Sequence, residues 1–233
     1  MLKKEKLLRY IVSNLVIILV VGGIFTATVF ALPAIKAVTG DSPVYKGGSK
    51  TGVAIMVNVY SGTEYLLPML DILDAASAKA TFFVGGIWAE KNETTLKEIY
   101  MRGHEIGSHG YLHKSHSKLD RAGNFKEIDV THKLIKSILG IDMNLFAPPS
   151  GDYSDITVGV AKELGYKTIM WTKDTIDWRD QDSALITKRA TSGLEAGNLI
   201  LTHPTAATVK SLSDIITAVS AKGLALNTVS EVL

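Results

Sequence analysis

The chain has 233 residues, 46% of them hydrophobic, and its formal net charge at pH 7 is +2. It contains no cysteine, which excludes disulfide bonds and thiolate metal ligands. The first nine residues carry four basic groups and one acidic group, a net charge of +3, so the rest of the chain carries about −1 (2 − 3). This near-neutral remainder argues against a nucleic-acid partner, because no basic stripe is present to neutralise phosphates.

The segment 11–32 is apolar and has no charged residue. A helix of roughly twenty such residues spans the hydrocarbon core of a bilayer. By the positive-inside rule, the basic residues 1–10 stay in the cytoplasm and the rest of the chain lies outside. A cleavable signal peptide is the alternative, with Val29 and Ala31 before the cut, but the length of the apolar run favours an uncleaved anchor. We therefore predict a single-pass membrane protein whose C-terminal domain is extracytoplasmic.

Residues 33–49 are rich in Gly, Pro, Ser and Lys and show no apolar periodicity, which predicts a tether. The folded domain is predicted at 50–233. It opens with an apolar, β-branched run at 52–60, typical of a strand buried on both faces. A helix at 64–77, a strand at 79–86 and a helix at 92–103 follow, the last with Asn92 placed to cap it and Gly103 to end it.

Strands and helices continue to alternate to the end of the chain. Further strands are predicted at 104–109, 144–149, 167–172, 198–203 and 224–233, and further helices at 126–140, 154–165, 184–194 and 211–223. Short loops between alternating elements imply parallel strands with right-handed crossovers. The fold class is therefore α/β, a barrel or an incomplete barrel, in which the chemistry lies at the carboxyl ends of the strands.

Polar and aromatic residues gather at those ends. His109 and His113 stand four apart, so a helical turn would aim both imidazoles the same way, as metal binding needs. The strand ends also hold Asn58, Val59, Gly85, Pro148, Pro149, Asp174, Asp177, Trp178 and His203.

Five short motifs at these positions resemble those of the polysaccharide deacetylase family, also called the NodB homology domain. In order they are a strand end followed by a helix and "ATFFVGG", then "HGYLH", "PPSG", "DTIDW" and "LTH". The resemblance covers the chain from about Lys50 to Leu233. It implies a distorted barrel of about seven parallel strands that holds a divalent metal, commonly zinc, and removes N-acetyl groups from chitin or peptidoglycan sugars.

The resemblance also implies roles for single residues. His109 and His113 match the two histidine ligands of the metal, and His203 matches the acid that protonates the leaving amine. Asp177 and Trp178 match the aspartate and tryptophan of the fourth motif. Asp177 is expected to hold His203 in one tautomer. We expect Trp178, with Pro148 and Pro149, to form a substrate-binding wall, because an aromatic ring stacks on a sugar face.

The first motif departs from the family pattern. The family has "DDG" here, with a general base followed by a metal ligand, and the matching residues are Asn58 and Val59. Asparagine cannot take up a proton at neutral pH and valine has no lone pair for a metal. The arginine that orients the base is replaced by Ala147, as expected once its partner is lost, because a buried unpaired charge is destabilising. The metal is therefore predicted to be weakly bound or absent.

Plainer roles are also open for these residues. The histidine pair could be ordinary polar loop residues, and Trp178 could belong to the core. Glu64 could substitute as ligand or base, although a residue in the first turn of a helix is more often exposed. His104 and His116 are expected to be solvated or structural.

Two functions follow from the resemblance, and a third alternative is a structural envelope partner that needs only the anchor and the fold. The first is a membrane-anchored, extracytoplasmic deacetylase of N-acetylated cell-wall sugars with a modified metal site, hydrolysing the amide C–N bond with Asn58, Asp177 and His203 at the site. The second is a noncatalytic, carbohydrate-binding relative of the envelope. The asparagine at the first strand end resembles a sporulation-associated branch of the family. The partners expected are cell-wall polysaccharide and, through the N-terminal helix, the membrane.

Overall fold

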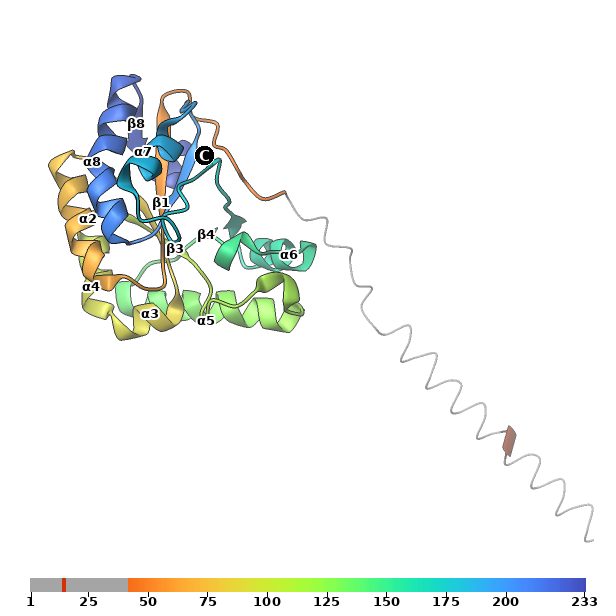
Figure 1. Ribbon diagram of the computed structural model, residues 1–233. Helices are drawn as coiled ribbons and strands as arrows, with labels where there is room; N and C mark the ends of the chain where they lie inside the picture. The colour runs from red at the N-terminus through yellow and green to blue at the C-terminus, as the bar shows by residue number, and fades with distance from the viewer. Residues whose placement is uncertain (1–13, 16–41) are drawn as a thin grey trace, which may run out of the picture. The chain divides into compact units, whose positions relative to one another are not determined.

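The computed structural model describes residues 14–15 and 42–233. Helices alternate with strands along the folded part of the chain, and Figure 1 shows the helices arranged around β1 and its neighbours. The elements are β1 (Gly52–Val59), α2 (Thr63–Ala75), β2 (Thr81–Val84), α3 (Gly86–Lys91), α4 (Glu93–Met101), β3 (Glu105–Ser108), η1 (His116–Lys118), α5 (Arg121–Leu139), β4 (Leu145–Phe146), η2 (Pro149–Gly151), α6 (Asp155–Glu163), β5 (Lys167–Thr168), β6 (Lys173–Asp174), α7 (Ser183–Thr191), β7 (Leu199–Thr202), α8 (Ala206–Ala221), β8 (Ala225–Asn227) and α9 (Val229–Val232).

The strands form one sheet in the order β5-β4-β3-β2-β1-β7-β6, with β8 beside the start of β1. Every pair of these strands is parallel. The two edge strands, β5 and β6, are joined by residues 169–172 alone, so this short stretch spans the gap between the edges. The predicted α/β fold with parallel strands is confirmed, as an incomplete barrel.

Strand β1 is buried along its whole length. Side chains alternate between the two faces of a strand. Val53, Ile55, Val57 and Val59 pack in the hydrophobic cluster that the helices contribute to. Ala54 and Met56 pack in a second cluster, inside the barrel, with residues of other strands, of the segments after β4 and β5, and of α9. Asn58 continues this inward series at the carboxyl end of the strand.

The last residues of the predicted tether, 33–49, belong to the folded domain. Val44 forms a parallel bridge with Ile169, and Lys46 forms an antiparallel bridge with Asn198. These backbone pairs bind the segment to the residue that follows β5 and to the residue that precedes β7. The folded unit therefore starts before Lys50. The sequence did not indicate this, because backbone pairing does not require a periodic pattern of apolar residues.

The predicted membrane span lies almost wholly outside the described residues, as do the predicted cytoplasmic segment 1–10 and most of the tether. Among the residues that are described, no helix is long and apolar enough to cross a bilayer.

The cap predicted for the helix at 92–103 is wrong in its detail. Asn92 precedes α4, but its side chain does not accept a hydrogen bond from the first turn of that helix. Its amide instead donates to the carbonyl of Trp88 in α3, at 2.8 Å. Helix α3 ends immediately before α4, so the asparagine ties the two helices together. Gly103 follows α4 with φ +77°, as expected of a residue that ends a helix.

His104, just before β3, is only 2% exposed. Its Nδ1 accepts a hydrogen bond from the backbone N–H of Ala80 at 3.2 Å, and its ring lies edge-on to Phe82. Burial, aided by the nearby Lys79, lowers the pKa of His104 to about 4. The residue is therefore structural.

This pKa makes stability depend on pH. An unfolded histidine has a pKa of about 6.5, so between that value and about 4 the unfolded chain binds the proton more readily. The stabilisation that comes from burying neutral His104 is complete above pH 6.5 and is lost as the pH falls toward 4. From pH 7 to 4.5 we expect this residue to account for about 2 to 3 kcal/mol of lost unfolding free energy.

Urea unfolding at several pH values checks this. His104→Asn keeps an acceptor for Ala80, and its unfolding free energy should fall less steeply over this range than that of the wild type. Parallel pH profiles for the two proteins would contradict the assignment.

Candidate functional site

A cleft of about 540 Å³ opens at the carboxyl ends of the strands. Parallel strands bring their carboxyl ends to one edge, so residues far apart in sequence meet there. The cleft is lined by Asn58, Tyr60, Ser61, His109, His113, Ser150, Trp171, Asp174, Trp178, Leu201, His203, Pro204 and Thr205. Asn58, both predicted ligand histidines, Trp178 and His203 are thus brought together. Pro148 and Pro149 do not line the cleft, since the chain turns at η2 and presents Ser150 there.

The rings of His109 and His113 lie close, with centroids 5.1 Å apart. The helical turn suggested by their spacing is not formed. Both lie in the loop after β3, where Gly110 and His113 have positive φ values of 71° and 54°. The loop bends back on itself, and this bend rather than a helical repeat brings the imidazoles together.

His109 has a fixed orientation. Its Nδ1 lies 2.7 Å from the carbonyl oxygen of Ala147. A carbonyl can only accept, so Nδ1 carries the hydrogen and the lone pair is on Nε2. Burial lowers the pKa of His109 to about 3, and burial also lowers the pKa of His113. Both imidazoles are therefore neutral at neutral pH.

Glu127 fixes the backbone of this loop by hydrogen bonds. The sequence alone did not indicate this role. Its side chain is buried on α5, and one carboxylate oxygen accepts hydrogen bonds from the backbone N–H groups of Tyr111 (2.9 Å) and Leu112 (2.7 Å). Charge-assisted hydrogen bonds of this kind are stronger than neutral ones. The available signal was an acidic residue on the buried stripe of α5, next to Ile128.

His116 is structural, as one of its two predicted alternatives states. It is fully buried, and its Nδ1 lies 2.7 Å from the side-chain oxygen of Asn124. Its ring also packs on Phe146. The residue therefore belongs to the packing beneath the loop rather than to the cleft.

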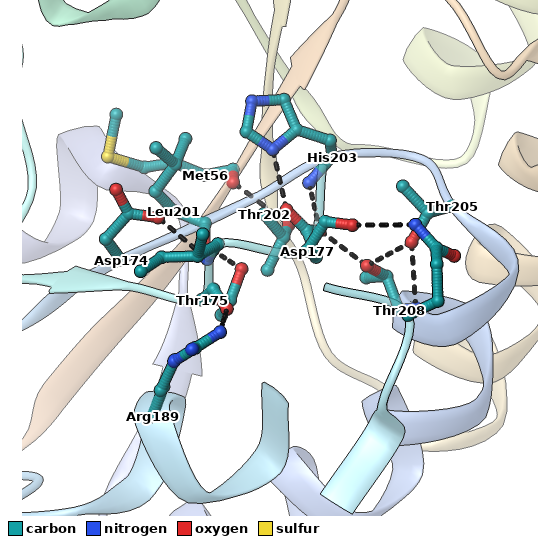
Figure 2. Close-up of polar contacts among 12 residues, drawn as sticks. Met56, Asp174, Thr175, Asp177, Arg189, Leu201, Thr202, His203, Thr205 and Thr208 are labelled. Carbon is teal, nitrogen blue, oxygen red and sulfur yellow. Dashed lines mark hydrogen bonds and ion pairs between the residues drawn. The ribbon is translucent and has the colours of Figure 1, made fainter. Parts of the chain in front are cut away.

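His203 is held by Asp177, as predicted (Figure 2). The carboxylate of Asp177 is fully buried and accepts three hydrogen bonds: from His203 Nδ1 (2.7 Å), His203 N (2.6 Å) and Thr208 Oγ1 (2.5 Å). The Nδ1 atom carries the hydrogen, so Nε2 of His203 has the free lone pair. Asp177 itself does not line the cleft and acts through the histidine.

The turn that carries Asp177 is fixed by neighbouring bonds. Asp174 accepts a hydrogen bond from the backbone N–H of Ile176 at 2.8 Å, and Ile176 has φ +54°. Thr175 donates to the carbonyl of Leu201 on β7 at 2.8 Å, and Arg189 of α7 donates to the carbonyl of Thr175 at 3.0 Å (Figure 2). The loop between β6 and α7 is thereby tied to β7, the strand that precedes His203.

The end of β1 has no carboxylate. Asn58 lines the cleft, while Val59 packs in the helix-facing cluster and does not line it. Alternation along the strand explains this placement. Ala147 is buried inside the barrel. Glu64 is exposed in the first turn of α2 and outside the cleft lining, so the structure gives it no place as a substitute ligand or base.

These residues do not fit the metal that the family resemblance implies. Catalytic zinc sites in proteins use three side-chain ligands. In residues 42–233 no three His, Cys, Asp or Glu side chains are grouped so that they could hold a metal ion. The two imidazoles His109 and His113 are present without a carboxylate from β1.

Three aromatic rings border the cleft. Trp178 is 61% exposed and Tyr60 is 43% exposed, and Trp171 is the third. Tyr60 packs on His113 with ring centroids 4.5 Å apart, which holds its ring in place. Sequence analysis missed Tyr60, although an aromatic residue directly after a strand end was a visible signal. Exposed rings of this kind can stack on the apolar face of a sugar.

The buried Asp177 carboxylate should be important for stability. Asp177→Asn removes its charge and exchanges an acceptor oxygen for a donor beside His203, so we expect the unfolding free energy to fall by about 2 kcal/mol. Urea unfolding measures this. Asp71→Asn, which removes a carboxylate from an exposed ion pair with Arg102, is the control and should change stability by less than about 1 kcal/mol. Equal losses in the two variants would contradict the importance given to Asp177.

Known proteins share this fold and these motifs. Residues 46–169 match the family model described as polysaccharide deacetylase. The chain is 41% identical over 192 residues to the uncharacterized protein YlxY of Bacillus subtilis, covering 82% of this chain and 60% of YlxY. It is 31% identical over 191 residues to a peptidoglycan-N-acetylglucosamine deacetylase of Bacillus cereus, covering 78% of this chain and 87% of that protein.

Solved structures of a pseudoenzyme share the fold. A wild-type CE4 family pseudoenzyme from Bacillus anthracis is 33% identical, with a TM-score of 0.80, and the match covers 82% of this chain and 68% of that one. A mutant of that pseudoenzyme is described as having restored enzymatic activity. With its family-model match, its relatives and its strand-end motifs, the chain belongs to the polysaccharide deacetylase family.

Proposed function

We propose that this protein binds N-acetylated cell-wall polysaccharide in the strand-end cleft without deacetylating it. The observation that carries the proposal is the end of β1, where Asn58 faces the cleft and Val59 faces the helices, so that this strand end offers no carboxylate to the cleft. A positioned general base contributes roughly 10² to 10⁴ in rate. Asn58 cannot act as a base at neutral pH.

Glycan binding is supported by what the cleft retains. Its volume of about 540 Å³ lies within the range of small-molecule sites. Tyr60, Trp171 and Trp178 supply rings for stacking, and Ser61, Ser150 and Asp174 supply polar groups. The similarity to a peptidoglycan deacetylase and to a pseudoenzyme of the same family agrees with a cleft that binds such glycans.

Slow deacetylation is the second candidate, favoured by one observation. His203 and Asp177 keep the hydrogen bond that orients an acid toward the leaving amine. The family resemblance assigns His203 to the leaving amine and not to the attacking water, so this half of the site does not replace the base that is missing from β1. We therefore place glycan binding first.

The proposal includes the location of the protein. The apolar segment 11–32 and the basic residues before it support a membrane anchor, with the folded domain on the extracytoplasmic side where the cell wall lies. An association with sporulation is proposed only by the resemblance of the first motif.

The catalytic part is tested by acetate release. The wild-type protein should release no acetate from N-acetylated chitin oligomers or peptidoglycan, and Asn58→Asp alone should change little. Asn58→Asp, Val59→Asp and Ala147→Arg combined should bind zinc and release acetate. Because Val59 packs among helix residues, an aspartate there must turn toward the cleft, and we expect a lower Tm for this variant.

Glu64→Gln in the wild-type background is the matched control and should have no effect, because this side chain is exposed and outside the cleft. Zinc binding is followed by calorimetry, and His109→Ala should abolish it in the triple variant. Wild-type turnover comparable to that of the Bacillus cereus deacetylase, assayed in parallel, would refute the noncatalytic function.

The location is tested by protease treatment of protoplasts. The domain beyond Lys50 should be cleaved while the N-terminus stays protected. Membrane and supernatant fractions then distinguish an anchored chain from one released by signal cleavage. A reporter that is active only in the cytoplasm, fused after Leu233, should be silent, and a signal from it would reverse the proposed orientation.

A further inference from the structure

Asn58 is an unsatisfied polar group in the floor of the cleft. It is 4% exposed, and its side-chain oxygen is buried and has no hydrogen-bond partner among residues 42–233. The rest of β1 carries no polar side chain. Buried polar groups in native proteins are almost always hydrogen-bonded, so an exception needs an explanation, and in a residue that lines a cleft a bound ligand supplies one.

Two histidines that line the cleft with Asn58 direct their Nδ1 hydrogens to other acceptors. His109 donates its Nδ1 hydrogen to Ala147, and His203 donates its Nδ1 hydrogen to Asp177. The backbone of Asn58 lies in the ladder between β1 and β2, in register with Phe83. The carboxamide therefore lies at the cleft with no described group that fixes its direction or pairs with its oxygen.

We propose that Asn58 is a specificity-determining residue that hydrogen-bonds the acetamido group of an N-acetylated sugar. This inference rests on the proposed glycan-binding function and names the feature of the glycan that the cleft recognises. A carboxamide has donors on its nitrogen and an acceptor oxygen, and an acetamido group offers one acceptor and one donor. The two groups can therefore pair in both directions.

A deacetylated sugar cannot make the same pair. When its amine is protonated, it is a cation that has only donors, so the N–H₂ of Asn58 is left without an acceptor. The charge must also lose water on entering the cleft. A site built to hydrogen-bond one group rejects analogues that leave its own polar groups unpaired. The cleft should thus distinguish acetylated from deacetylated glycan.

Tyr60 provides a matched comparison, because it lies at the same strand end and offers a ring instead of a polar group. Its ring is held on His113, at 4.5 Å, and is 43% exposed. A ring stacks on a sugar whether or not the sugar is acetylated. Loss of Tyr60 should weaken binding without changing the preference, whereas loss of Asn58 should change the preference.

The experiment titrates the full chain with a fully N-acetylated chitin hexamer and with the fully deacetylated hexamer. Tryptophan fluorescence reports binding, since Trp171 and Trp178 line the cleft. We expect the wild type to prefer the acetylated hexamer about tenfold or more. Asn58→Leu should bring the two affinities to within about threefold, and Asn58→Asp should favour the deacetylated hexamer through its negative charge. Tyr60→Ala should weaken both similarly.

Thermal unfolding of each variant shows that it is folded. Asn58→Leu replaces an unpaired amide by an apolar side chain in an apolar strand, so its Tm should not fall. Equal wild-type binding of both hexamers, or a preference that survives in Asn58→Leu, would overturn the role of Asn58 while leaving glycan binding intact. Binding of neither hexamer would overturn the proposed function and this inference together.

Discussion

The burial of β1 on both faces is the constraint on which the rest of the structure depends. This strand pairs with β2, β7 and β8 and carries side chains into two separate clusters. Because its side chains strictly alternate, the position of a residue along β1 determines the face of the sheet on which its side chain lies. The same rule that packs Val57 among the helices and Met56 in the barrel sends Asn58 to the cleft and Val59 away from it. Burial and function are thus set by one periodicity.

The two halves of the cleft have different characters. On the β7 side, a buried carboxylate, a histidine and two threonines form a connected network in which Asp177 accepts three hydrogen bonds. On the β1 side, the side-chain oxygen of Asn58 has no hydrogen-bond partner, and Ala147 is an uncharged, buried residue. A carboxylate, its arginine and its metal stabilise one another, so loss of one makes the others unfavourable to bury. The network around Asp177 involves none of these groups and is complete.

The loop that carries His109 and His113 is held in place by hydrogen bonds within the protein. Glu127 holds the backbone of this loop from α5, and Ala147 holds His109 through a carbonyl oxygen. Neither interaction involves a metal. The loop is therefore pre-organised by the fold, and its neutral imidazoles, with Tyr60 packed on His113, form part of the wall of a cleft.

Sequence reasoning predicted the fold class, most of the alternating strands and helices, and the gathering of Asn58, His109, His113 and His203 at the strand ends. These follow from local periodicity and from the rule that parallel strands end at one edge. It also predicted the contact of Asp177 with His203. It was wrong at 224–233, predicted as one strand, where a short β8 is followed by the helix α9, and it did not predict the separate elements α3 and β6. It missed Glu127, Tyr60 and the pairing of Val44 and Lys46, because each depends on a partner distant in sequence.

The sequence by itself determined which chemical groups this protein lacks, since the absence of a carboxylate at positions 58 and 59 holds in any fold. Only the tertiary structure decided which of the two residues faces the cleft, and that the oxygen of Asn58 has no partner there. The physical reason is that the chemical groups of a residue are the same in any conformation of the chain. In contrast, the direction in which a side chain points, and whether its polar atoms find hydrogen-bond partners, depend on the strands, loops and helices that pack against it.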